Sequence, residues 1–464
     1  MLSRHSHLIL LYLACSIIQL LSGCASLPSR KEVLKESARG PGAPQVKDAQ
    51  GRLSAQERKH VLERAAGDAG DAEYLKQFIL AEQGITGSPL VGGNRVTLLV
   101  DGTAAYKAMF DAIKRAKYHI HLETYVLADD PIGRQFADLL LERRAAGVVV
   151  KVIYDSIGSI RSSSEYFNRL RKGGVMVHEF HPVNPTKDLR FWRFTQRDHR
   201  KLLIVDGKVA FTGGINISDV YSSGSSSGRP EKHATESRWR DTHVRIEGPA
   251  VAEFQKLFLR IWAEEEEKGM AKHYFPPLQN VGHELVRVVA STGGDDEYSI
   301  YKAYLAAISL ARERIWVTQA YFTPNDEFVD ALKDAARRGV DVRILLPGFS
   351  DHKMVLYASR AHYTKLLKAG IKLYERKDRL LHAKTAVIDG LWSTVGSSNL
   401  DYFSFLHNNE ANAVILGQNL GRQMEQLFQL DLSHAQSIEL EKWKKRPPWE
   451  RLMEKFSVLF KYWL

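Results

Sequence analysis

The sequence has 464 residues, 44% of them hydrophobic, which is enough for two domains or one large duplicated domain with a sizeable core. Lys and Arg outnumber Asp and Glu by 65 to 54, and the net charge of +11 predicts an anionic partner, either nucleic acid or anionic lipid. The two cysteines, Cys15 and Cys24, both lie near the N-terminus. This position excludes an intrachain disulfide from the rest of the chain.

Residues 1–23 have the features of a signal peptide. Arg4 precedes an apolar stretch from Leu8 to Leu21 that is shorter than the about 20 residues of a membrane-spanning helix. The ending Leu21-Ser22-Gly23-Cys24 resembles the bacterial lipoprotein box, which implies cleavage before Cys24 and acylation of that cysteine. Several acyl chains on one residue would anchor the protein stably. In that pattern Ala25 favours a periplasm-facing position at the outer membrane; an uncleaved anchor or a plain secretory signal is the alternative.

Residues 24–88 are predicted to form a tether followed by short helices. The stretch up to about residue 52 is polar and contains Gly40-Pro41-Gly42-Ala43-Pro44, which is typical of a linker. Residues 54–83 have a helix-forming composition with mixed charge. The folded body is therefore expected to begin near Pro89.

From residue 89 the chain repeats itself, with a first half at 89–280 and a second half at 281–434. Strands alternate with helices in both halves, and their Val/Ile/Leu runs suit buried strands. The expected strands are 118–125, 147–154 and 175–180, with counterparts at 315–321, 339–346 and 371–374. The expected helices are 136–146 and 164–172, with counterparts at 327–338 and 357–369. This order predicts an α/β fold of two repeats, each with a β-sheet flanked by helices, packed about a pseudo-twofold axis.

Residues 435–464 are predicted to form an amphipathic helix. After Pro447-Pro448, apolar and aromatic residues recur at helical spacing with Arg451, Lys455 and Lys461 among them. The apolar positions are Trp449, Leu452, Met453, Phe456, Leu459, Phe460 and Trp463. A basic helix with such a face suits a membrane interface. Docking on the protein's own body is the alternative.

One motif occurs twice with the same internal spacing. Each copy has the pattern H-x-K-x4-D, and after six intervening residues a glycine opens a short segment that ends in asparagine. The copies are His199, Lys201, Asp206, Gly213, Gly214 and Asn216, and His382, Lys384, Asp389, Gly396, Ser397 and Asn399. A single H-x-K carries no weight, but two copies at equivalent places in a repeat are very hard to obtain by chance.

The spacing has a physical interpretation. Residues two apart on a strand point to one face, so each His and its Lys would face the same pocket. The glycines Gly213, Gly214 and Gly396 permit close backbone approach, and Asn216, Asn399 and Ser397 are candidate phosphate ligands. Asp206 and Asp389, at the ends of their strands, are expected to be structural.

If the repeats pack about a twofold axis, two imidazoles and two ammonium groups face one phosphodiester. One histidine can attack phosphorus to give a phosphohistidine, and the other can donate a proton to the leaving oxygen. Asp241 and Glu410, downstream of the first and second motif, are candidates to orient the histidines. No cluster in the motifs suggests a metal, and no cofactor is expected.

These motifs resemble the phospholipase D superfamily, and more closely its bacterial cardiolipin synthase branch. The resemblance covers roughly residues 89–430 and includes Pro89–Val96, Tyr154–Ser159, Trp239–Pro249 and Gly396–Asp401 with Asn408 and Glu410. It implies two phospholipase D-type repeats with mixed sheets. It also implies that phosphatidylglycerol forms a phosphatidyl-histidine at His199, with His382 as acid and base, and that a second phosphatidylglycerol accepts the phosphatidyl group to give cardiolipin and glycerol. The chain departs from the family in lacking two N-terminal spanning helices and in having Phe403 where Arg is frequent.

A phosphatidyltransferase that makes cardiolipin is therefore the main hypothesis. A phospholipase D that uses water or another alcohol shares the same covalent intermediate and stays open. A phosphodiesterase acting on nucleic acid fits the charge, but the lipid anchor and the amphipathic tail favour phospholipid, so no nucleic-acid partner is expected. The remaining alternative is a membrane-tethered scaffold with an inactive site.

Overall fold

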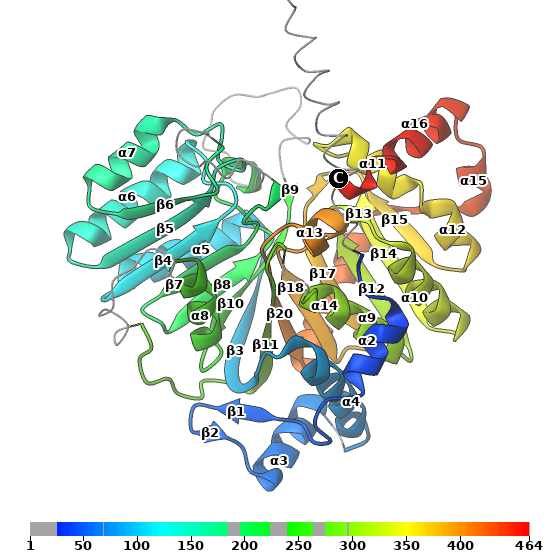
Figure 1. Cartoon of the computed structure of the whole chain (residues 1–464), viewed down its shortest axis with the longest axis horizontal. Helices are drawn as coiled ribbons and strands as arrows, with labels where there is room; N and C mark the ends of the chain where they lie inside the picture. Colours follow the sequence, from blue (N-terminus) through cyan, green and yellow to red (C-terminus); the bar gives the residue numbers. More distant parts are fainter. Residues whose placement is uncertain are drawn as a thin grey trace, which may run out of the picture.

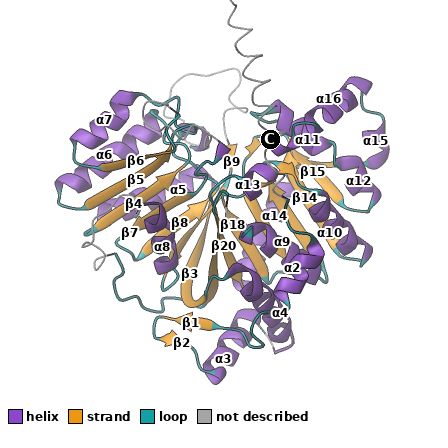
Figure 2. Cartoon of the chain, viewed as in Figure 1, coloured by secondary structure: helices purple, strands orange, loops and turns teal. Residues whose placement is uncertain are grey.

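The computed structural model describes residues 26–67, 69–183, 195–222, 239–262, 274–294 and 297–463. The expected signal peptide and Cys24 lie outside these residues. Within them, strands from both halves join in one mixed sheet of 17 strands with helices on its faces (Figures 1 and 2). This confirms the predicted α/β class with two repeats.

The first half builds its sheet in the order β6-β5-β4-β7-β8-β10-β3, in which β4, β5 and β6 are parallel and the other neighbours are antiparallel. Its strands are β3 (Leu90–Val100), β4 (His119–Thr124), β5 (Val149–Asp155), β6 (Met176–Phe180), β7 (Lys201–Val205), β8 (Val209–Gly213) and β10 (Thr242–Glu247). Its helices are α5 (Asp101–Arg115), α6 (Pro131–Ala145), α7 (Ser164–Lys172) and α8 (Val251–Trp262). The short η2 (Asp219–Tyr221) follows the first motif.

The second half repeats this order as β15-β14-β12-β17-β18-β20-β11, again with its first three strands parallel. Its strands are β11 (Glu284–Ser291), β12 (Arg314–Gln319), β14 (Asp341–Pro347), β15 (Lys372–Arg376), β17 (Lys384–Ile388), β18 (Trp392–Gly396) and β20 (Glu410–Leu416). Its helices are α9 (Ser299–Leu310), α10 (Asp326–Arg337), α11 (Lys353–Arg360), α12 (Tyr363–Lys368), α13 (Tyr402–Leu406) and α14 (Gln418–Leu432). The helix expected at 357–369 is thus two helices, because α11 packs on α16 whereas α12 packs on β15.

The two half-sheets meet at β3 and β11. The C-terminal part of β3 pairs with β10 of its own half, and its N-terminal part pairs with β11 of the other half. Short parallel pairs add further links: β9 (Trp239–Arg240) with β16 (Leu380–Leu381), and β13 (Phe322–Thr323) with β19 (Leu400–Asp401). The β9–β16 pair crosses from one half to the other, so backbone hydrogen bonds fix the halves to each other.

The apolar core has three parts, because each sheet is buried on both faces. One cluster lies under α5, α6 and α7 of the first half, and another lies under α9, α10 and α12 of the second. The third fills the space between the halves, where α8 and α14 pack on the sheets. On β7, Leu202 and Ile204 belong to this central cluster while Leu203 and Val205 belong to the outer one, which is the alternation that a two-sided strand requires.

Residues 26–52 differ from the expected tether, because they fold onto the body, mainly its second half, together with residues 53–88 (blue, at the bottom of Figure 1). This region contains α2 (Arg30–Ser37), β1 (Val46–Asp48), β2 (Gly51–Arg52), α3 (Ala55–Ala66) and α4 (Ala69–Thr86). Val33 and Val46 are buried in the outer core, and β1 extends the sheet beside β3. The buried Glu82 pairs with Arg287 and accepts a hydrogen bond from Trp392. Apolar burial and this ion pair hold the segment in place, although its composition is that of a linker.

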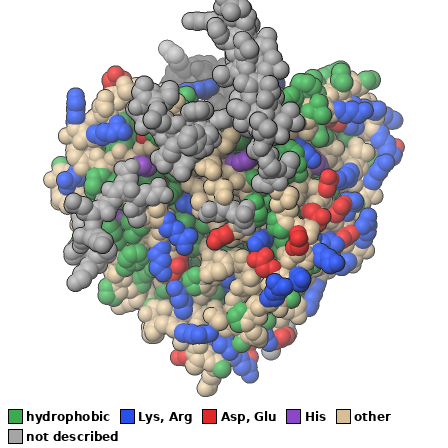
Figure 3. Space-filling model, viewed as in Figure 1, with side chains coloured by type: hydrophobic (Ala, Val, Ile, Leu, Met, Phe, Trp, Pro, Cys, Tyr) green, Lys and Arg blue, Asp and Glu red, His purple; other side chains and the backbone are tan. Residues whose placement is uncertain are grey.

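The tail residues 435–463 begin with β21 (Ala435–Ile438), which pairs with the edge strand β15, and continue as α15 (Leu440–Lys444), α16 (Pro448–Val458) and η5 (Lys461–Trp463). α16 docks on α11 and buries Glu454 and Ser457, whereas Leu452 and Leu459 are 67% and 75% exposed. Glu454 pairs with Arg446. The helix therefore presents an apolar face to the surroundings, visible as green side chains at the upper right of Figure 3. Across the described ranges, no helix is both long and apolar enough to cross a bilayer.

Asp206 and Asp389 occupy equivalent turns at the ends of β7 and β17. Both have a positive φ, of 52° and 51°, a conformation that Asp tolerates better than most residues. The carboxylate of Asp206 accepts the backbone N–H groups of residues 117, 118 and 119 at 2.7–2.9 Å. The carboxylate of Asp389 accepts those of residues 312, 313 and 314 at 2.6–2.9 Å. Each aspartate thus fixes the turn that leads into the neighbouring central strand.

We expect Asp206→Ala to lower the free energy of unfolding by about 2 kcal/mol, because three N–H groups lose a charged acceptor. Thermal unfolding measures this loss. Asp206→Asn, which keeps one acceptor oxygen and tolerates the positive φ, should be less destabilised. Activity per folded molecule should stay at the wild-type level in both variants. A stable but inactive Asp206→Ala protein would contradict a structural role.

Candidate active site

The two motifs lie at equivalent places in the centre of the half-sheets. Lys201 and Lys384 are the first residues of β7 and β17, beside β4 and β12. Each histidine lies two residues before the first residue of its strand instead of within it. The amide of His199 donates to the carbonyl of Asn409 at 3.0 Å, and the amide of His382 donates to that of Arg240 at 2.8 Å. Each histidine is therefore fixed by the backbone of the opposite half.

The histidine side chains are also held across the halves. Nδ1 of His199 lies 2.9 and 3.1 Å from the two carboxylate oxygens of Glu410, which belongs to the second half. Nδ1 of His382 lies 2.7 Å from Oδ2 of Asp241, which belongs to the first half. The sequence identified both carboxylates but not this crossed pairing. In each pair Nε2 is the ring nitrogen that remains for chemistry.

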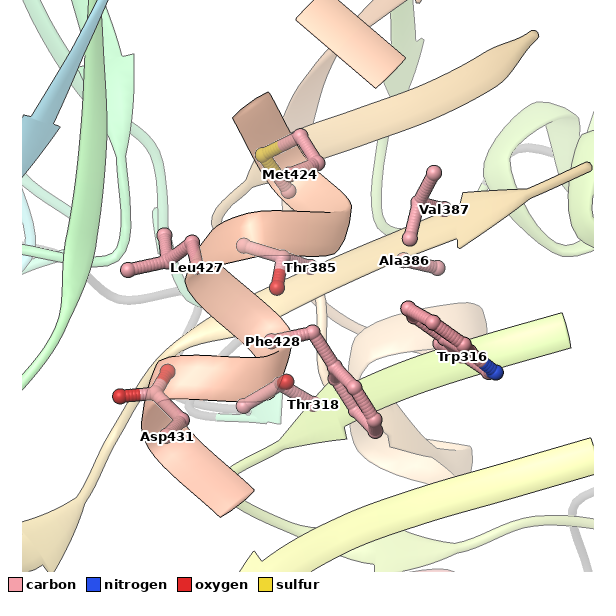
Figure 4. Close-up of a pocket in the computed structure, with 9 residues that line it drawn as sticks. All are labelled: Trp316, Thr318, Thr385, Ala386, Val387, Met424, Leu427, Phe428 and Asp431. Carbon is pink, nitrogen blue, oxygen red and sulfur yellow. The ribbon is translucent and has the colours of Figure 1, made fainter. Parts of the chain in front are cut away.

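Buried arginines support the crossed segments. Arg240, next to Asp241, donates to both carboxylate oxygens of Asp431 at 3.0 and 2.7 Å. Asp431 lies near the end of α14, where Figure 4 shows it beside a small pocket between α14 and strands β12 and β17. On the other side, Arg197 pairs with the buried Asp155 at 3.0 Å, and the carbonyl of Arg197 accepts the amide of Asn409. Both acid-bearing segments are thus anchored by ion pairs within the protein.

The two lysines are buried beside their histidines. The Nζ of each donates to the backbone carbonyl of the histidine two residues before it, and the Nζ of Lys384 also lies about 3 Å from the His382 ring. Burial lowers the pKa of Lys201 to about 7 and that of Lys384 to about 8. Burial also lowers the pKa of His199, and the charge of Lys384 from the other half lowers it further. The two motifs therefore share one electrostatic site.

The two carboxylates differ in their acidity. Burial would raise the pKa of Glu410, but the charges of His199 and Lys201 and hydrogen bonds from His199 and Ser397 hold it at about 2. Burial raises the pKa of Asp241 to about 6 despite the charge of Lys384. The site is consequently asymmetric, with a fully ionised acid beside His199 and a weaker one beside His382.

The other motif residues support these acids. The hydroxyl of Ser397 donates to Glu410, so it is engaged in orienting that acid in this structure and does not point to a phosphate. At the position equivalent to Ser397, a Cβ on Gly214 would lie 2.2 Å from Oδ1 of Asp241. A Cβ on Gly396 would likewise lie 2.0 Å from Asn412, and Gly213 has a φ of 154° and packs against His243. These glycines let the acid-bearing strands approach closely.

The two asparagines differ. Both polar atoms of the Asn216 side chain have partners. Its Oδ1 accepts from the backbone N–H of Val126, and its Nδ2 donates to the hydroxyl of Tyr221. In the described structure, Oδ1 of the buried Asn399 has no hydrogen-bond partner. Oδ1 of Asn399 can accept from a donor such as a substrate hydroxyl, whereas a phosphate oxygen would have to be bound through the Nδ2–H group of the same side chain.

Aromatic residues that the motif pattern did not identify also contact the site. Tyr125 packs edge-on against His199 with ring centroids 4.9 Å apart, and Nζ of Lys201 lies 5.3 Å from its ring. Tyr221 and Trp239 contact His382. Two of them had a signal in the sequence: Tyr125 is the last residue of the expected strand 118–125, and Trp239 is the first residue of the segment Trp239–Pro249.

The sequence pattern described as "Cardiolipin synthase, PLD-like domain" matches residues 109–262 and 304–432. Cardiolipin synthase 2 of Bacillus anthracis is 36% identical over 359 residues, which cover 77% of this chain and 68% of that protein. Cardiolipin synthase of Geobacillus thermodenitrificans (strain NG80-2) is 35% identical over 378 residues, which cover 80% and 72%. This chain belongs to the phospholipase D-like cardiolipin synthase family. The predicted resemblance is thereby confirmed.

The fold of this family member is also found in a solved structure. Phosphatidylserine synthase from Haemophilus influenzae Rd KW20 superposes with a TM-score of 0.61 at 14% identity, covering 82% of this chain and 99% of that one. At this low identity the likeness concerns the fold alone.

We expect the KM of this family member for an anionic phospholipid to rise about tenfold between pH 7 and pH 9. A lysine with a lowered pKa carries its charge only below that pKa, and the pKa values here are about 7 and about 8. Initial rates on vesicles at each pH measure the effect. The KM of Lys201→Gln should be higher than that of wild type at pH 7 and should rise less between pH 7 and pH 9. Lys107→Gln, on the surface, should show the wild-type dependence of KM on pH. A KM that is constant over this range would contradict the assignment.

Proposed function

We propose that this protein is a phosphatidyltransferase that joins two phosphatidylglycerol molecules to give cardiolipin and glycerol. The main support is the crossed arrangement, in which two histidines, each held by a carboxylate of the other half, share one site with two buried lysines. Membership of the cardiolipin synthase family supports the choice of substrate.

In the first step, Nε2 of His199 attacks phosphorus and the bond from phosphorus to the glycerol oxygen breaks. Glu410 accepts the hydrogen bond of Nδ1–H, so that the Nε2 lone pair is available and the positive charge that forms on the ring is stabilised. His382 donates a proton to the departing glycerol oxygen. Burial lowers the pKa of free His382 well below its usual value, and the negative phosphodiester favours its protonated form.

In the second step, neutral His382 removes the proton from a hydroxyl of the second phosphatidylglycerol, and that oxygen attacks phosphorus as the bond to His199 breaks. Lys201, Lys384 and Asn399 bind the phosphate oxygens in both steps. All four His and Lys side chains are at most about one tenth exposed. This burial limits the access of water and favours transfer to an alcohol over hydrolysis.

The protein is also proposed to be membrane-bound at two places. Acyl chains on Cys24 would anchor it as a periplasm-facing lipoprotein of the outer membrane, and the exposed apolar face of α16 would lie in the interface. Trp449, Leu452, Phe456 and Leu459 are exposed along this face, and Arg451 and Lys455 are exposed beside them. A basic helix with such a face attracts anionic headgroups as well as acyl chains.

Purified protein incubated with phosphatidylglycerol vesicles and a chelator should yield cardiolipin and glycerol, identified by mass. With 32P-labelled lipid and an acid-free quench, the wild-type protein should retain label. His199→Ala should lose the labelled adduct, and His382→Ala should retain it and turn over at least about 100-fold more slowly.

His60→Ala, a surface histidine, should behave as wild type. Formation of phosphatidic acid alone would identify a hydrolase, and a need for a divalent ion would refute the proposed chemistry. An adduct that persists in His199→Ala but not in His382→Ala would reverse the two roles.

Cys24→Ser should move the protein from the membrane fraction toward the soluble fraction. In that background, Leu452→Ser combined with Leu459→Ser should weaken sedimentation with phosphatidylglycerol vesicles by about tenfold, because two exposed leucines lose apolar burial. Leu34→Ser, at an exposed leucine of α2, is the matched control. Unchanged fractionation of Cys24→Ser would refute the lipoprotein assignment, and unchanged sedimentation would refute the role of α16.

A further inference from the structure

The surroundings of His382 are richer in polar aromatic groups than those of His199. The rings of Tyr221, Trp239 and Tyr321 lie 5.7, 4.9 and 6.3 Å from the His382 ring. Among the described residues, the aromatic ring within such a distance of His199 is that of Tyr125. The His382 side therefore has the rings of two tyrosines, Tyr221 and Tyr321, where the His199 side has that of Tyr125.

A carboxylate completes this side of the site. The hydroxyl of Tyr321 donates to Asp351, with distances of 2.9 and 3.1 Å to its two oxygens. The Asp351 side chain is 29% exposed, so part of it remains open to a ligand. Its negative charge also acts on the site, since it opposes the burial that lowers the pKa of Lys384 and of His382.

Where the structure describes the first half, this pair has no counterpart at the equivalent position. Phe322 pairs with Leu400 in the second half as Leu127 pairs with Ile217 in the first, so Tyr321 stands where the first half has Val126. A hydroxyl and carboxylate pair on one side of a twofold site indicates that the two sides receive different parts of the substrate.

The geometry of displacement at phosphorus indicates which part of the substrate lies on each side. In a displacement at phosphorus, the nucleophile and the leaving oxygen are roughly in line on opposite sides. With His199 as nucleophile, the departing glycerol leaves on the side of His382, and the accepting hydroxyl later enters there. The His382 side therefore receives a glycerol moiety in both steps.

We infer that Tyr321 and Asp351 form the binding site for the polyol headgroup, first for the glycerol that leaves and then for the glycerol of the acceptor lipid. This inference rests on the proposed function. The carboxylate of Asp351 also contacts Ser350 and His352, and its two oxygens have further acceptor positions for the hydroxyls that do not react. The Tyr221 hydroxyl lies 3.3 Å from Nδ1 of His382, the nitrogen that pairs with Asp241, so it supports the ring and not the reacting Nε2.

Helix α11 lies between the Asp351 side of the site and the exposed apolar face of α16. α11 begins two residues after Asp351, and Tyr357 of α11 packs against Trp449 of α16 with ring centroids 6.3 Å apart. At the other end of the tail, Tyr462 packs on Tyr402, which follows the second motif. An acceptor lipid held by its headgroup at Asp351 can thus keep its acyl chains along the apolar face of α16.

The test measures which alcohol the protein uses as acceptor, as the ratio of two products formed in the same reaction. The donor is phosphatidyl-p-nitrophenol, whose leaving group needs no proton, and the acceptors are glycerol and 1-propanol at equal concentration. Wild-type protein should prefer glycerol, and Asp351→Asn and Tyr321→Phe should each lower the glycerol-to-propanol product ratio about tenfold. Release of p-nitrophenol in the first turnover should be unchanged. Asp341→Asn, at the opposite end of β14, should keep the wild-type ratio.

An unchanged ratio in both variants would overturn the inference, and so would loss of the p-nitrophenol burst in both, because that step involves no polyol. A wild-type preference for ethanolamine over glycerol that Asp351→Asn abolishes would show a site for an ammonium group, and would overturn it as well. The proposed function fails separately, when wild-type protein forms no phosphatidyl alcohol from any acceptor.

Discussion

The structure depends on two hydrogen-bonded pairs that cross between its halves, His199 with Glu410 and His382 with Asp241. Both carboxylates are completely buried, so each loses its hydration and requires a partner inside the protein. The histidine partner comes from the other repeat, while Ser397 and the backbone N–H of Thr242 donate to these acids from within their own halves. Sheet pairing at β3 and β11, the β9–β16 pair and the core between α8 and α14 all hold the halves at the distance that these two pairs need.

Duplication gives the site its symmetry, but the reaction requires the two histidines to act differently. The side chains around them supply that difference. Glu410 stays ionised because histidine, lysine and serine all stabilise its charge, whereas Asp241 has a pKa near 6. Within the described residues, the pair of Tyr321 hydroxyl and Asp351 carboxylate is not repeated at the equivalent position of the first half, where Val126 stands. In the proposed mechanism, this asymmetry distinguishes the nucleophile His199 from the acid His382.

The surroundings of the second half relate the site to its lipid substrate. α16 buries Glu454 and Ser457 and leaves Leu452 and aromatic side chains exposed beside Arg451 and Lys455, so its exposed side is both apolar and basic. The N-terminal residues cover the opposite end of this half, where α2, α3 and α4 complete its outer core. The second half therefore carries structural additions at both ends, and the one near the active site has the apolar character that contact with acyl chains requires.

The sequence by itself determined the family, the duplicated α/β order and the two sets of His, Lys and Asp, because these features depend on local spacing and on repetition along the chain. It also identified Asp241 and Glu410. The pairing of those acids with histidines 141 and 211 residues away was decided by tertiary structure, since it follows from how two complete sheets pack. The same holds for residues 26–52, whose linker-like composition is outweighed by burial of residues such as Val33 and Val46, and for Asp351, which lies far from both motifs in sequence. Local patterns specify strands and motifs; which side chains meet across the two halves depends on packing that no local pattern encodes.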